Sequence, residues 1–166
     1  MTDRGQIILP GGIRLGWCPL EGRTGHEAAW GLLEELYGAP LPEVRRTDRG
    51  KPYFPEGKFH FSISHTKRHA FCALGSAPLG LDAEEADREI RPALAEKNLS
   101  EQEMLQFRTA GDPRTALLKL WVLKEAEAKR TGEGLRGYPN KTDFSPDDPR
   151  VLTIAGCYVA VLAEGD

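Results

Sequence analysis

The chain has 166 residues, of which 40% are hydrophobic and 28% are charged, and its formal net charge is −3. This length is enough for one globular unit with a real core, or for two small fused units. No apolar run reaches a membrane-spanning length, and the N-terminus lacks the apolar core of a secretory signal, so we expect a cytoplasmic protein with no membrane partner. The acidic balance provides no general basic surface for nucleic acid.

The first 80 residues show the pattern of a small antiparallel sheet with one helix. Residues 6–17, QIILPGGIRLGW, predict a hairpin around a Pro-Gly-Gly turn. A helix follows, with a capping box of Thr24 and Glu27 at its start and Gly38 at its end. Apolar and polar residues alternate in FHFSISH, residues 59–65, which predicts a half-buried strand, and AFCAL, residues 70–74, is its expected hairpin partner.

The remaining residues predict a second strand-and-helix unit. In LGLDAEEAD a short strand should end near Asp82. Ser100 with Glu103 forms a capping box that opens a helix ending near Gly111. The long helix should then start at Asp112 and Pro113 and run to about Gly132, and VLTIAGCYVAVL, residues 151–162, predicts two further strands.

These elements predict an α+β fold with two pseudo-symmetric halves, residues 1–80 and 81–166, in a single compact unit. Each half would have a small antiparallel sheet packed against helices, and the long helix would belong to the second half. The three cysteines, Cys18, Cys72 and Cys157, are widely spaced in apolar surroundings. They indicate neither a disulfide framework nor a metal knuckle, and we expect them to be small buried hydrophobic residues.

Three carboxylates form a candidate metal site. Asp82 and Glu84 should share one face of a strand, and a carboxylate from the long helix, Glu125, could complete the oxygen set that Mg²⁺ prefers. The alternative is that LDAEE is only the acidic first turn of a following helix, where the helix dipole favours negative charge.

The long helix also carries Lys129 one turn after Glu125, beside Trp121, in WVLKEAEAKR. This pair could be an ordinary helix salt bridge, worth roughly 0.3 kcal/mol. We expect Trp121 to lie in the core. Another reading combines Asp82 with Glu127 and Lys129 as the acid-then-ExK pattern of metal-dependent nucleases, but that pattern needs ExK on a strand, whereas this run favours a helix.

Two further segments could bind phosphate. In SISHTKRH, residues 62–69, Ser64 and His65 end a strand beside two cations, although a polar hairpin tip is an equal alternative. His65 and His69 flank a turn rather than share a helix face, which makes zinc a weaker interpretation, and Ser64 is not in the G-x-S-x-G elbow of a hydrolase. In RRTDRGKPYFP a basic cluster surrounds Lys51, and the alternative there is a solvated loop.

Four ordered motifs resemble those of the 4′-phosphopantetheinyl transferase superfamily. They are RTDRGKP (46–52), FSISH (61–65), GLDAE (80–84) and WVLKEAEAK (121–129), followed by GEGL (132–135). The family pattern is R-T-x-x-G-K-P, F-N-I-S-H, G-I-D-I-E and W-x-x-K-E-(A/S)-x-x-K, then G-x-G-L. Ala83 and Ser62 depart from it without removing an expected ligand.

The resemblance implies Mg²⁺-dependent transfer of the phosphopantetheine arm of coenzyme A to a serine of an apo-acyl or apo-peptidyl carrier protein, with release of 3′,5′-ADP. It makes Asp82, Glu84 and Glu125 the metal ligands, and Glu125 and Lys129 the catalytic residues. The residues implied for coenzyme A binding are Arg46, Lys51, Ser64, His65 and Lys129.

The surfactin-type members have a longer basic N-terminal region than this chain, which has about 45 residues before RTDRGKP. The resemblance therefore implies a shortened, two-half, monomeric member that acts without nucleic acid. A catalytically weak relative that only binds coenzyme A or a carrier protein is the alternative. The motifs do not specify which carrier protein is used, because carrier recognition is a surface property.

Overall fold

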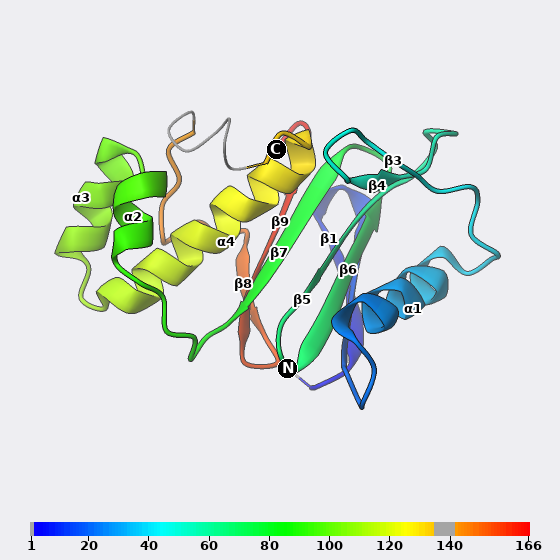
Figure 1. The fold of residues 1–166 in the computed structure, drawn as a ribbon, viewed down its shortest axis with the longest axis horizontal. Coiled ribbons are helices and arrows are strands. Elements are labelled where there is room, and N and C mark those ends of the chain that lie inside the picture. The colour runs from blue at the N-terminus through cyan, green and yellow to red at the C-terminus, as the bar shows by residue number, and fades with distance from the viewer. Residues whose placement is uncertain (1, 135–141) are drawn as a thin grey trace.

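A computed structural model describes residues 2–134 and 142–166. The fold is α+β, as predicted, with antiparallel sheets and helices packed against them (Figure 1). In chain order the elements are β1 (Gly5–Leu9), a 3₁₀ turn (Pro10–Gly12), β2 (Ile13–Pro19), α1 (Gly25–Tyr37), β3 (Arg45–Arg46), β4 (Pro52–Tyr53), β5 (His60–His65), β6 (His69–Gly75), β7 (Leu79–Glu85), α2 (Ala93–Asn98), α3 (Glu101–Thr109), α4 (Pro113–Thr131), β8 (Val151–Ile154) and β9 (Cys157–Ala163). Among the described residues, no helix is both long and apolar enough to cross a membrane.

The larger sheet has the strand order β1-β2-β6-β5, the smaller sheet has the order β7-β9-β8, and β3 and β4 form a separate two-stranded sheet. Both predicted hairpins of the first half, β1 with β2 and β5 with β6, are confirmed, as is the β8–β9 hairpin. The order β2-β6-β5 and the order β7-β9-β8 both place the first strand beside the third. This topology is compatible with two similar halves, but their pseudo-symmetry stays a prediction.

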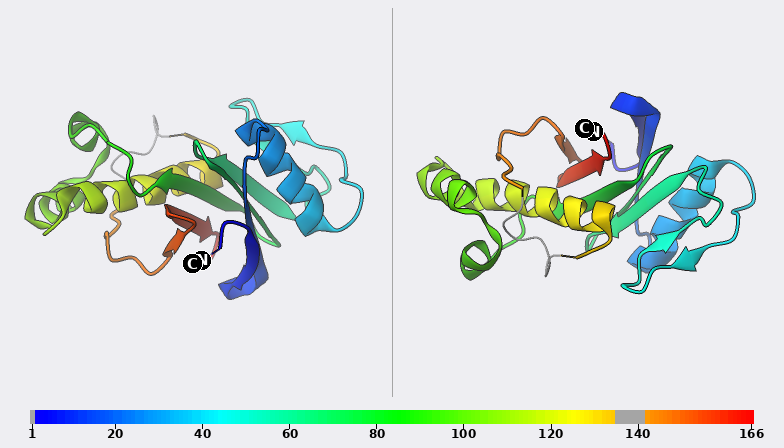
Figure 2. Two further views of the ribbon diagram at one scale, coloured as in Figure 1. Left: turned by 90° about the horizontal axis from the view of Figure 1, so that it is seen from below. Right: turned by 90° about the horizontal axis from the view of Figure 1, so that it is seen from above.

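Helices lie on the outer faces of the two sheets. The apolar side of α1 packs on β2, β5 and β6, and α4 runs diagonally along β7 and β9, as Figures 1 and 2 show from three directions. A further apolar core lies between the sheets, where Leu15 and Phe71 of the larger sheet meet Leu81 and Val159 of the smaller one. Consecutive residues of β7 therefore alternate between this shared core and the side that faces α4.

The predicted helix ends are confirmed because the signals are local. Both capping boxes form, with the hydroxyls of Thr24 and Ser100 accepting from the backbone N–H groups of Glu27 and Glu103. The side chain of Asp112 accepts from the backbone N–H of Thr115 and starts α4. The short helix α2 was not predicted from the sequence.

The prediction that β5 is half-buried is wrong, because β7 lies beside it and covers its polar face. Phe61 points into the core under α1, yet Ser62 and Ser64 on the other face are each only 6% exposed. The backbone N–H of Leu81 donates to Ser62 Oγ at 3.0 Å, so a side chain rather than a strand ladder joins β5 to β7. The polar residues of FSISH therefore lie at the contact between β5 and β7.

The predicted end of β7 near Asp82 is also wrong, since the strand continues to Glu85. Asp82 is consequently a mid-strand residue, paired with Ala160 of β9. Gly80 explains how α4 approaches this strand so closely. A Cβ at that position would lie 1.9 Å from the backbone oxygen of Ala126, so only glycine allows the helix to lie against β7 at this point.

Candidate active site

The three predicted acidic residues come together where α4 crosses β7. Asp82 and Glu84 lie on the strand face toward the helix, and Glu125 of α4 lines the same cavity as both. The cavity has a volume of about 500 Å³, and we call it the acidic cavity. It is lined by His26, Ala29, Ile63, Ser64, His65, Asp82, Ala83, Glu84, Arg88, Trp121, Glu125 and Lys129.

Asp82 is the most perturbed of these acids. It is buried, and burial, reinforced by the neighbouring Glu125 and Glu84, raises its pKa to about 7. Lys129 opposes this shift, since its Nζ lies 3.2 Å from Asp82 Oδ1, but the ion pair does not outweigh the desolvation. The second oxygen, Oδ2, is buried and has no hydrogen-bond partner in the described structure. A buried carboxylate oxygen without a partner is costly unless a ligand satisfies it.

Glu125 and Glu84 are less buried. Burial raises the pKa of Glu125, the Lys129 ammonium lowers it, and the negative charge of Glu84 raises it again. Glu84 forms an ion pair with Arg88, four residues further along the chain. Arg88 also lines the acidic cavity and was not predicted as a site residue, because nothing in its local sequence distinguishes it from a solvated arginine.

A second cavity adjoins the first on the other side of Lys129. Its volume is about 310 Å³, and we call it the basic cavity. Its lining combines the RTDRGKP loop, strand β5 and the C-terminal end of α4, namely Arg49, Gly50, Lys51, Pro52, Phe61, Ser62, Ile63, Glu125, Ala128, Lys129, Gly132 and Gly134. Ile63, Glu125 and Lys129 line both cavities, so these three residues form their junction.

Lys51 holds the RTDRGKP loop against the start of β7 and the C-terminal end of α4. Its Nζ donates to the backbone oxygens of Arg130 at 3.1 Å and Leu79 at 3.4 Å. Burial and the nearby Arg130 lower the pKa of Lys51. Arg49 also bonds across to the backbone oxygen of Glu133. Of the GEGL segment, Leu135 lies outside the described residues.

The remaining predicted coenzyme A residues fall into two groups. Ser64 and His65 line the acidic cavity, and Ser64 Oγ donates to Asp82 Oδ1 at 3.4 Å. The ring of His65 lies against the start of α1, where a Cβ on Gly25 would be 2.2 Å from its Cγ. By contrast, the exposed Arg46 donates to the backbone oxygen of Gly50 at 3.0 Å and lines neither cavity, whereas the unpredicted Arg49 does line the basic cavity.

The structure places Trp121 and Glu127, two residues of α4 about which the sequence made predictions. Trp121 is half-buried and lines the acidic cavity, so the prediction that it is a core residue is wrong. Its side of the helix faces the site. Glu127 points elsewhere and pairs with Arg130 at 2.5 Å, and it lines neither cavity. Because ExK lies on a helix and Glu127 is away from Asp82, the nuclease pattern does not form.

Comparisons with known proteins agree with the motifs. A family model described as the 4′-phosphopantetheinyl transferase superfamily matches residues 78–158, which include all three acids and Lys129. The chain is 33% identical over 93 residues to the 4′-phosphopantetheinyl transferase gsp of Aneurinibacillus migulanus, covering 55% of this chain and 38% of that protein. It is 34% identical over 109 residues to the 4′-phosphopantetheinyl transferase Sfp of Bacillus subtilis strain 168, covering 63% and 48%.

A third relative, a putative 4′-phosphopantetheinyl transferase of Haemophilus influenzae, is 28% identical over 120 residues, covering 69% of this chain and 51% of that protein. The chain thus spans about half the length, or less, of the curated relatives that it matches. The family model, the relatives and the ordered motifs identify the same group, and residues 78–158 of the chain belong to the 4′-phosphopantetheinyl transferase superfamily.

Proposed function

We propose that this chain transfers the 4′-phosphopantetheine arm of coenzyme A to a serine of an apo-acyl or apo-peptidyl carrier protein and releases 3′,5′-ADP. The observation that carries the proposal is the junction of the two cavities. There, three carboxylates adjoin a lysine, and an acidic cavity meets a basic one. The pyrophosphate of coenzyme A would have a metal ion on one side, which needs carboxylates, and a nucleotide on the other, which needs positive charge.

The acidic residues fit a Mg²⁺ ion by their chemistry. Asp82, Glu84 and Glu125 supply only oxygen ligands, and Asp82 Oδ2 is a buried oxygen without a partner among the described residues. These three residues would hold the metal. When bound, Mg²⁺ would neutralise charge on the pyrophosphate of coenzyme A, and it would bring the pKa of Asp82 down again because a cation favours the carboxylate.

Lys129 and Glu125 have the catalytic roles in this proposal. The ammonium of Lys129 lies at the junction, where it can bind the pyrophosphate and offset the charge that develops on the leaving 3′,5′-ADP. The ion pair between Lys129 and Asp82 would then weaken, because Lys129 would pair with the pyrophosphate and Asp82 would hold the metal. Glu125 would accept the proton of the carrier serine, directly or through one water molecule, and its raised pKa suits a general base near neutral pH.

The nucleotide end of coenzyme A would lie toward the RTDRGKP loop. We assign Arg46 and Lys51 to the 3′-phosphate and adenine end, and we add Arg49, because it lines the basic cavity together with Lys51. Ser64 and His65, which were predicted for the same end, line the acidic cavity, so we assign them to the part of coenzyme A next to the pyrophosphate. Lys51 at present donates to the backbone oxygens of Leu79 and Arg130, and Arg49 donates to the backbone oxygen of Glu133. In this proposal they both close the cleft and provide positive charge beside the phosphate.

The site would lie between two halves, residues 1–80 and 81–166, of one compact unit. The protein would act as a cytoplasmic monomer, with coenzyme A and a carrier protein as its partners and without nucleic acid or membrane. Support for the two halves comes from the contacts across them, such as Ser64 to Asp82 and Lys51 to Arg130.

The proposal is tested by incubating the chain with coenzyme A, Mg²⁺ and several apo-carrier proteins, and then measuring the mass of each carrier. We expect one phosphopantetheine group on at least one carrier, and no addition when Mg²⁺ is chelated. No added mass on any carrier would overturn the transferase. Thermal stabilisation by coenzyme A and Mg²⁺ without transfer would instead identify a binding relative, because a ligand of the folded state raises stability by mass action.

A further inference from the structure

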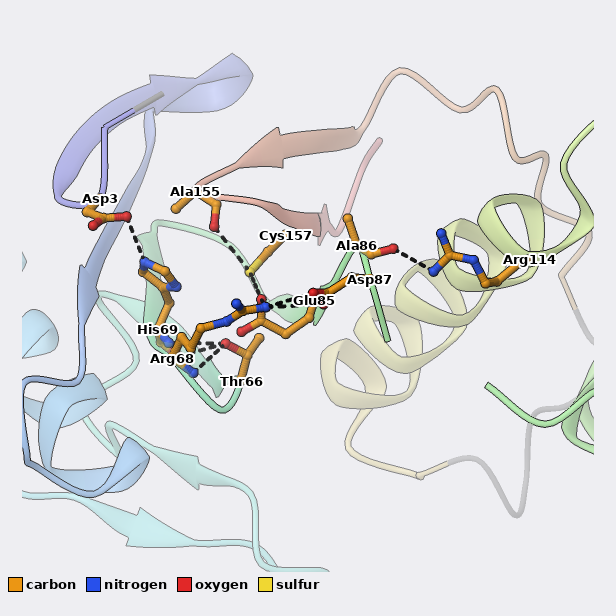
Figure 3. Close-up of polar contacts among 10 residues, drawn as sticks. All are labelled: Asp3, Thr66, Arg68, His69, Glu85, Ala86, Asp87, Arg114, Ala155 and Cys157. Carbon is orange, nitrogen blue, oxygen red and sulfur yellow. Dashed lines mark hydrogen bonds and ion pairs between the residues drawn. The ribbon is translucent and has the colours of Figure 1, made fainter. Parts of the chain in front are cut away.

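A second polar cluster lies on the opposite side of β7 from the candidate active site. It consists of His69 at the start of β6, Glu85 at the end of β7 and Cys157 at the start of β9 (Figure 3). Glu85 and Cys157 are direct partners in the β7–β9 ladder. Both sheets therefore contribute to the cluster, which closes one end of the apolar core between them. All three residues are buried.

Two atoms in this cluster have no hydrogen-bond partner in the described structure. They are His69 Nδ1 and Glu85 Oε1, and both are inaccessible to solvent. A buried imidazole nitrogen and a buried carboxylate oxygen each lose hydration when the protein folds, and neither recovers it here. Two such atoms in one cluster of possible ligands point to a bound group that satisfies both.

His69 and Glu85 each use their other polar atom, Nε2 and Oε2, for contacts with neighbouring side chains. Nδ1 and Oε1 therefore remain available to a ligand within the cluster. His69 Nε2 lies 3.1 Å from Asp3 Oδ1, so the imidazole can donate a proton to Asp3 and keep Nδ1 as an acceptor. Arg68 Nη2 donates to Glu85 Oε2 at 3.0 Å, and Thr66 also interacts with this carboxyl, but no hydrogen bond of normal geometry reaches Oε1 within the described residues. A carboxylate that orients a histidine through its far nitrogen is the usual arrangement behind a metal-bound imidazole.

The donor set and its spacing suit zinc. One nitrogen, one oxygen and one sulfur ligand atom all lie within 4.8 Å of one another. In a tetrahedral site with metal–ligand bonds of about 2.0–2.3 Å, ligand atoms are about 3.3–3.8 Å apart. Side-chain rotations that shorten the longest separation by about 1 Å would reach that geometry, and a water molecule could take the fourth position.

The charges would also balance. A divalent ion with one carboxylate, one thiolate and one neutral imidazole has no net charge, which favours burial. Arg68, which bonds to Glu85, is itself paired with Asp87 at 3.1 Å. Magnesium fits this set poorly, because it prefers oxygen ligands.

We propose that His69, Glu85 and Cys157 bind a divalent transition-metal ion of the zinc class, which ties the two sheets together at the end of their shared core. This site is separate from the acidic cavity, and none of its three residues lines either cavity. In the metal-free protein, burial raises the pKa of the Cys157 thiol to about 12, and the thiol donates to Glu85 Oε2 at 3.6 Å. The metal would replace the thiol proton, which passes to solvent.

Cobalt titration of the chelator-treated full chain, in excess Mg²⁺, tests the site directly. The excess Mg²⁺ is added to fill the proposed site of Asp82, Glu84 and Glu125. Co²⁺ bound by Cys157 gives a thiolate-to-cobalt charge-transfer band that oxygen ligands cannot give. We expect this band to saturate at one equivalent, and Zn²⁺ to abolish it and to raise the Tm in a concentration-dependent way. A folded wild-type chain that shows no such band would overturn the proposal.

Variants then assign the ligands. Cys157→Ala should lose the band and Cys72→Ala, which removes another buried thiol, should keep it. Asp3 is exposed, so Asp3→Ala should fold normally and weaken Co²⁺ binding by about 10- to 100-fold, while Asp147→Ala on another surface should leave it unchanged. A band that survives in folded Cys157→Ala, or affinity unchanged in Asp3→Ala, would contradict the assignment.

Discussion

Helix α4 carries two lysines that pair with acids, and the two pairs differ in how completely their atoms are satisfied. Lys124 Nζ lies 2.7 Å from Glu103 Oε1, and both side chains are almost fully buried. Glu103 also accepts from the backbone N–H groups of Ser100 and Phe144, so both of its oxygens have partners. This pair connects α3, α4 and the segment before β8.

The pair of Lys129 and Asp82, five residues further along the helix, is left incomplete. The separation is 3.2 Å, Lys129 is a third exposed, and Asp82 Oδ2 has no partner in the described structure. Burial raises the pKa of Asp82 to about 7, although a cation lies beside it. The comparison indicates that a buried pair whose carboxylate oxygens all have partners is part of the packing between helices, whereas a pair with an unsatisfied oxygen in a cavity is suited to bind a ligand.

The largest stability effect should come from breaking the satisfied pair. Glu103→Ala removes the carboxylate that pairs with the buried Lys124 ammonium and the acceptor of two backbone N–H groups, and we expect a loss of about 3–5 kcal/mol in the free energy of unfolding. Urea denaturation measures it. Glu101→Ala, on the exposed side of the same helix, is the control and should change stability by less than about 1 kcal/mol. Similar losses in the two variants would remove the distinction between the pairs.

Removing the acid of the incomplete pair, Lys129 with Asp82, should raise the free energy of unfolding instead of lowering it. In the absence of divalent metal at pH 8, Asp82→Asn should stabilise the fold by about 1–3 kcal/mol, because it removes a poorly compensated buried charge. Thermal unfolding in EDTA measures this gain, and transfer activity should be lost.

The stability of the protein should also depend on pH, because the pKa of Asp82 is raised. The pKa of Asp82 is raised above its unfolded value, so its contribution to stability is present at low pH and is lost as pH rises through about 7. The stability advantage of Asp82→Asn should therefore shrink between pH 8 and pH 5. An advantage that does not change over this range would show that Asp82 titrates normally.

An effect of similar size, on ligand binding rather than on stability, is expected for Lys129. Lys129→Met should weaken coenzyme A binding in the presence of Mg²⁺ by about 10- to 100-fold, since a hydrogen bond to a charged group is worth about 1.5–3 kcal/mol. Calorimetric titration measures the affinity. Lys119→Met is the matched control, because that lysine lies on the same helix but over the ring of Tyr158. Equal affinities of the two variants would place the pyrophosphate elsewhere.

The smallest effect should come from Arg88, which holds Glu84 in an exposed ion pair. Arg88→Ala should free this carboxylate and strengthen Mg²⁺ binding by up to about fivefold, the equivalent of the 0.2–1 kcal/mol typical of such pairs. Arg108→Ala on α3 serves as the control, and competition with a magnesium indicator measures both. Weaker Mg²⁺ binding in Arg88→Ala would mean that Arg88 supports the metal site.

Features that depend on a few neighbouring residues could be predicted from the sequence. The capping boxes at Thr24 and Ser100 are complete within four residues, and strand alternation correctly put Asp82 and Glu84 on one face. The periodicity of α4 and the ordered motifs were sufficient to bring Glu125 to the same cavity.

Features that depend on packing between distant segments could not be predicted. The burial of Ser62 requires β7 to lie beside β5, and the half-buried position of Trp121 depends on where α4 crosses β7. Cys157 was expected to be only a small buried hydrophobic residue, because nothing local indicates that His69 and Glu85 approach it. The sequence also does not show which acid–lysine pair is satisfied, since the partners of Glu103 come from residues up to 41 positions away.

The central claim is that transfer takes place where Glu125 faces the acids of β7, and two isosteric variants of α4 test it most directly. Glu125→Gln and Glu127→Gln change the same group two residues apart, but only Glu125 lines the cavities. We predict that Glu125→Gln lowers the rate of phosphopantetheine transfer to an apo-carrier protein by at least about 10³-fold, while both variants keep the wild-type Tm within a few degrees. Glu127→Gln should transfer at nearly the wild-type rate. A folded Glu125→Gln variant with wild-type activity, or an equal loss in Glu127→Gln, would contradict the account.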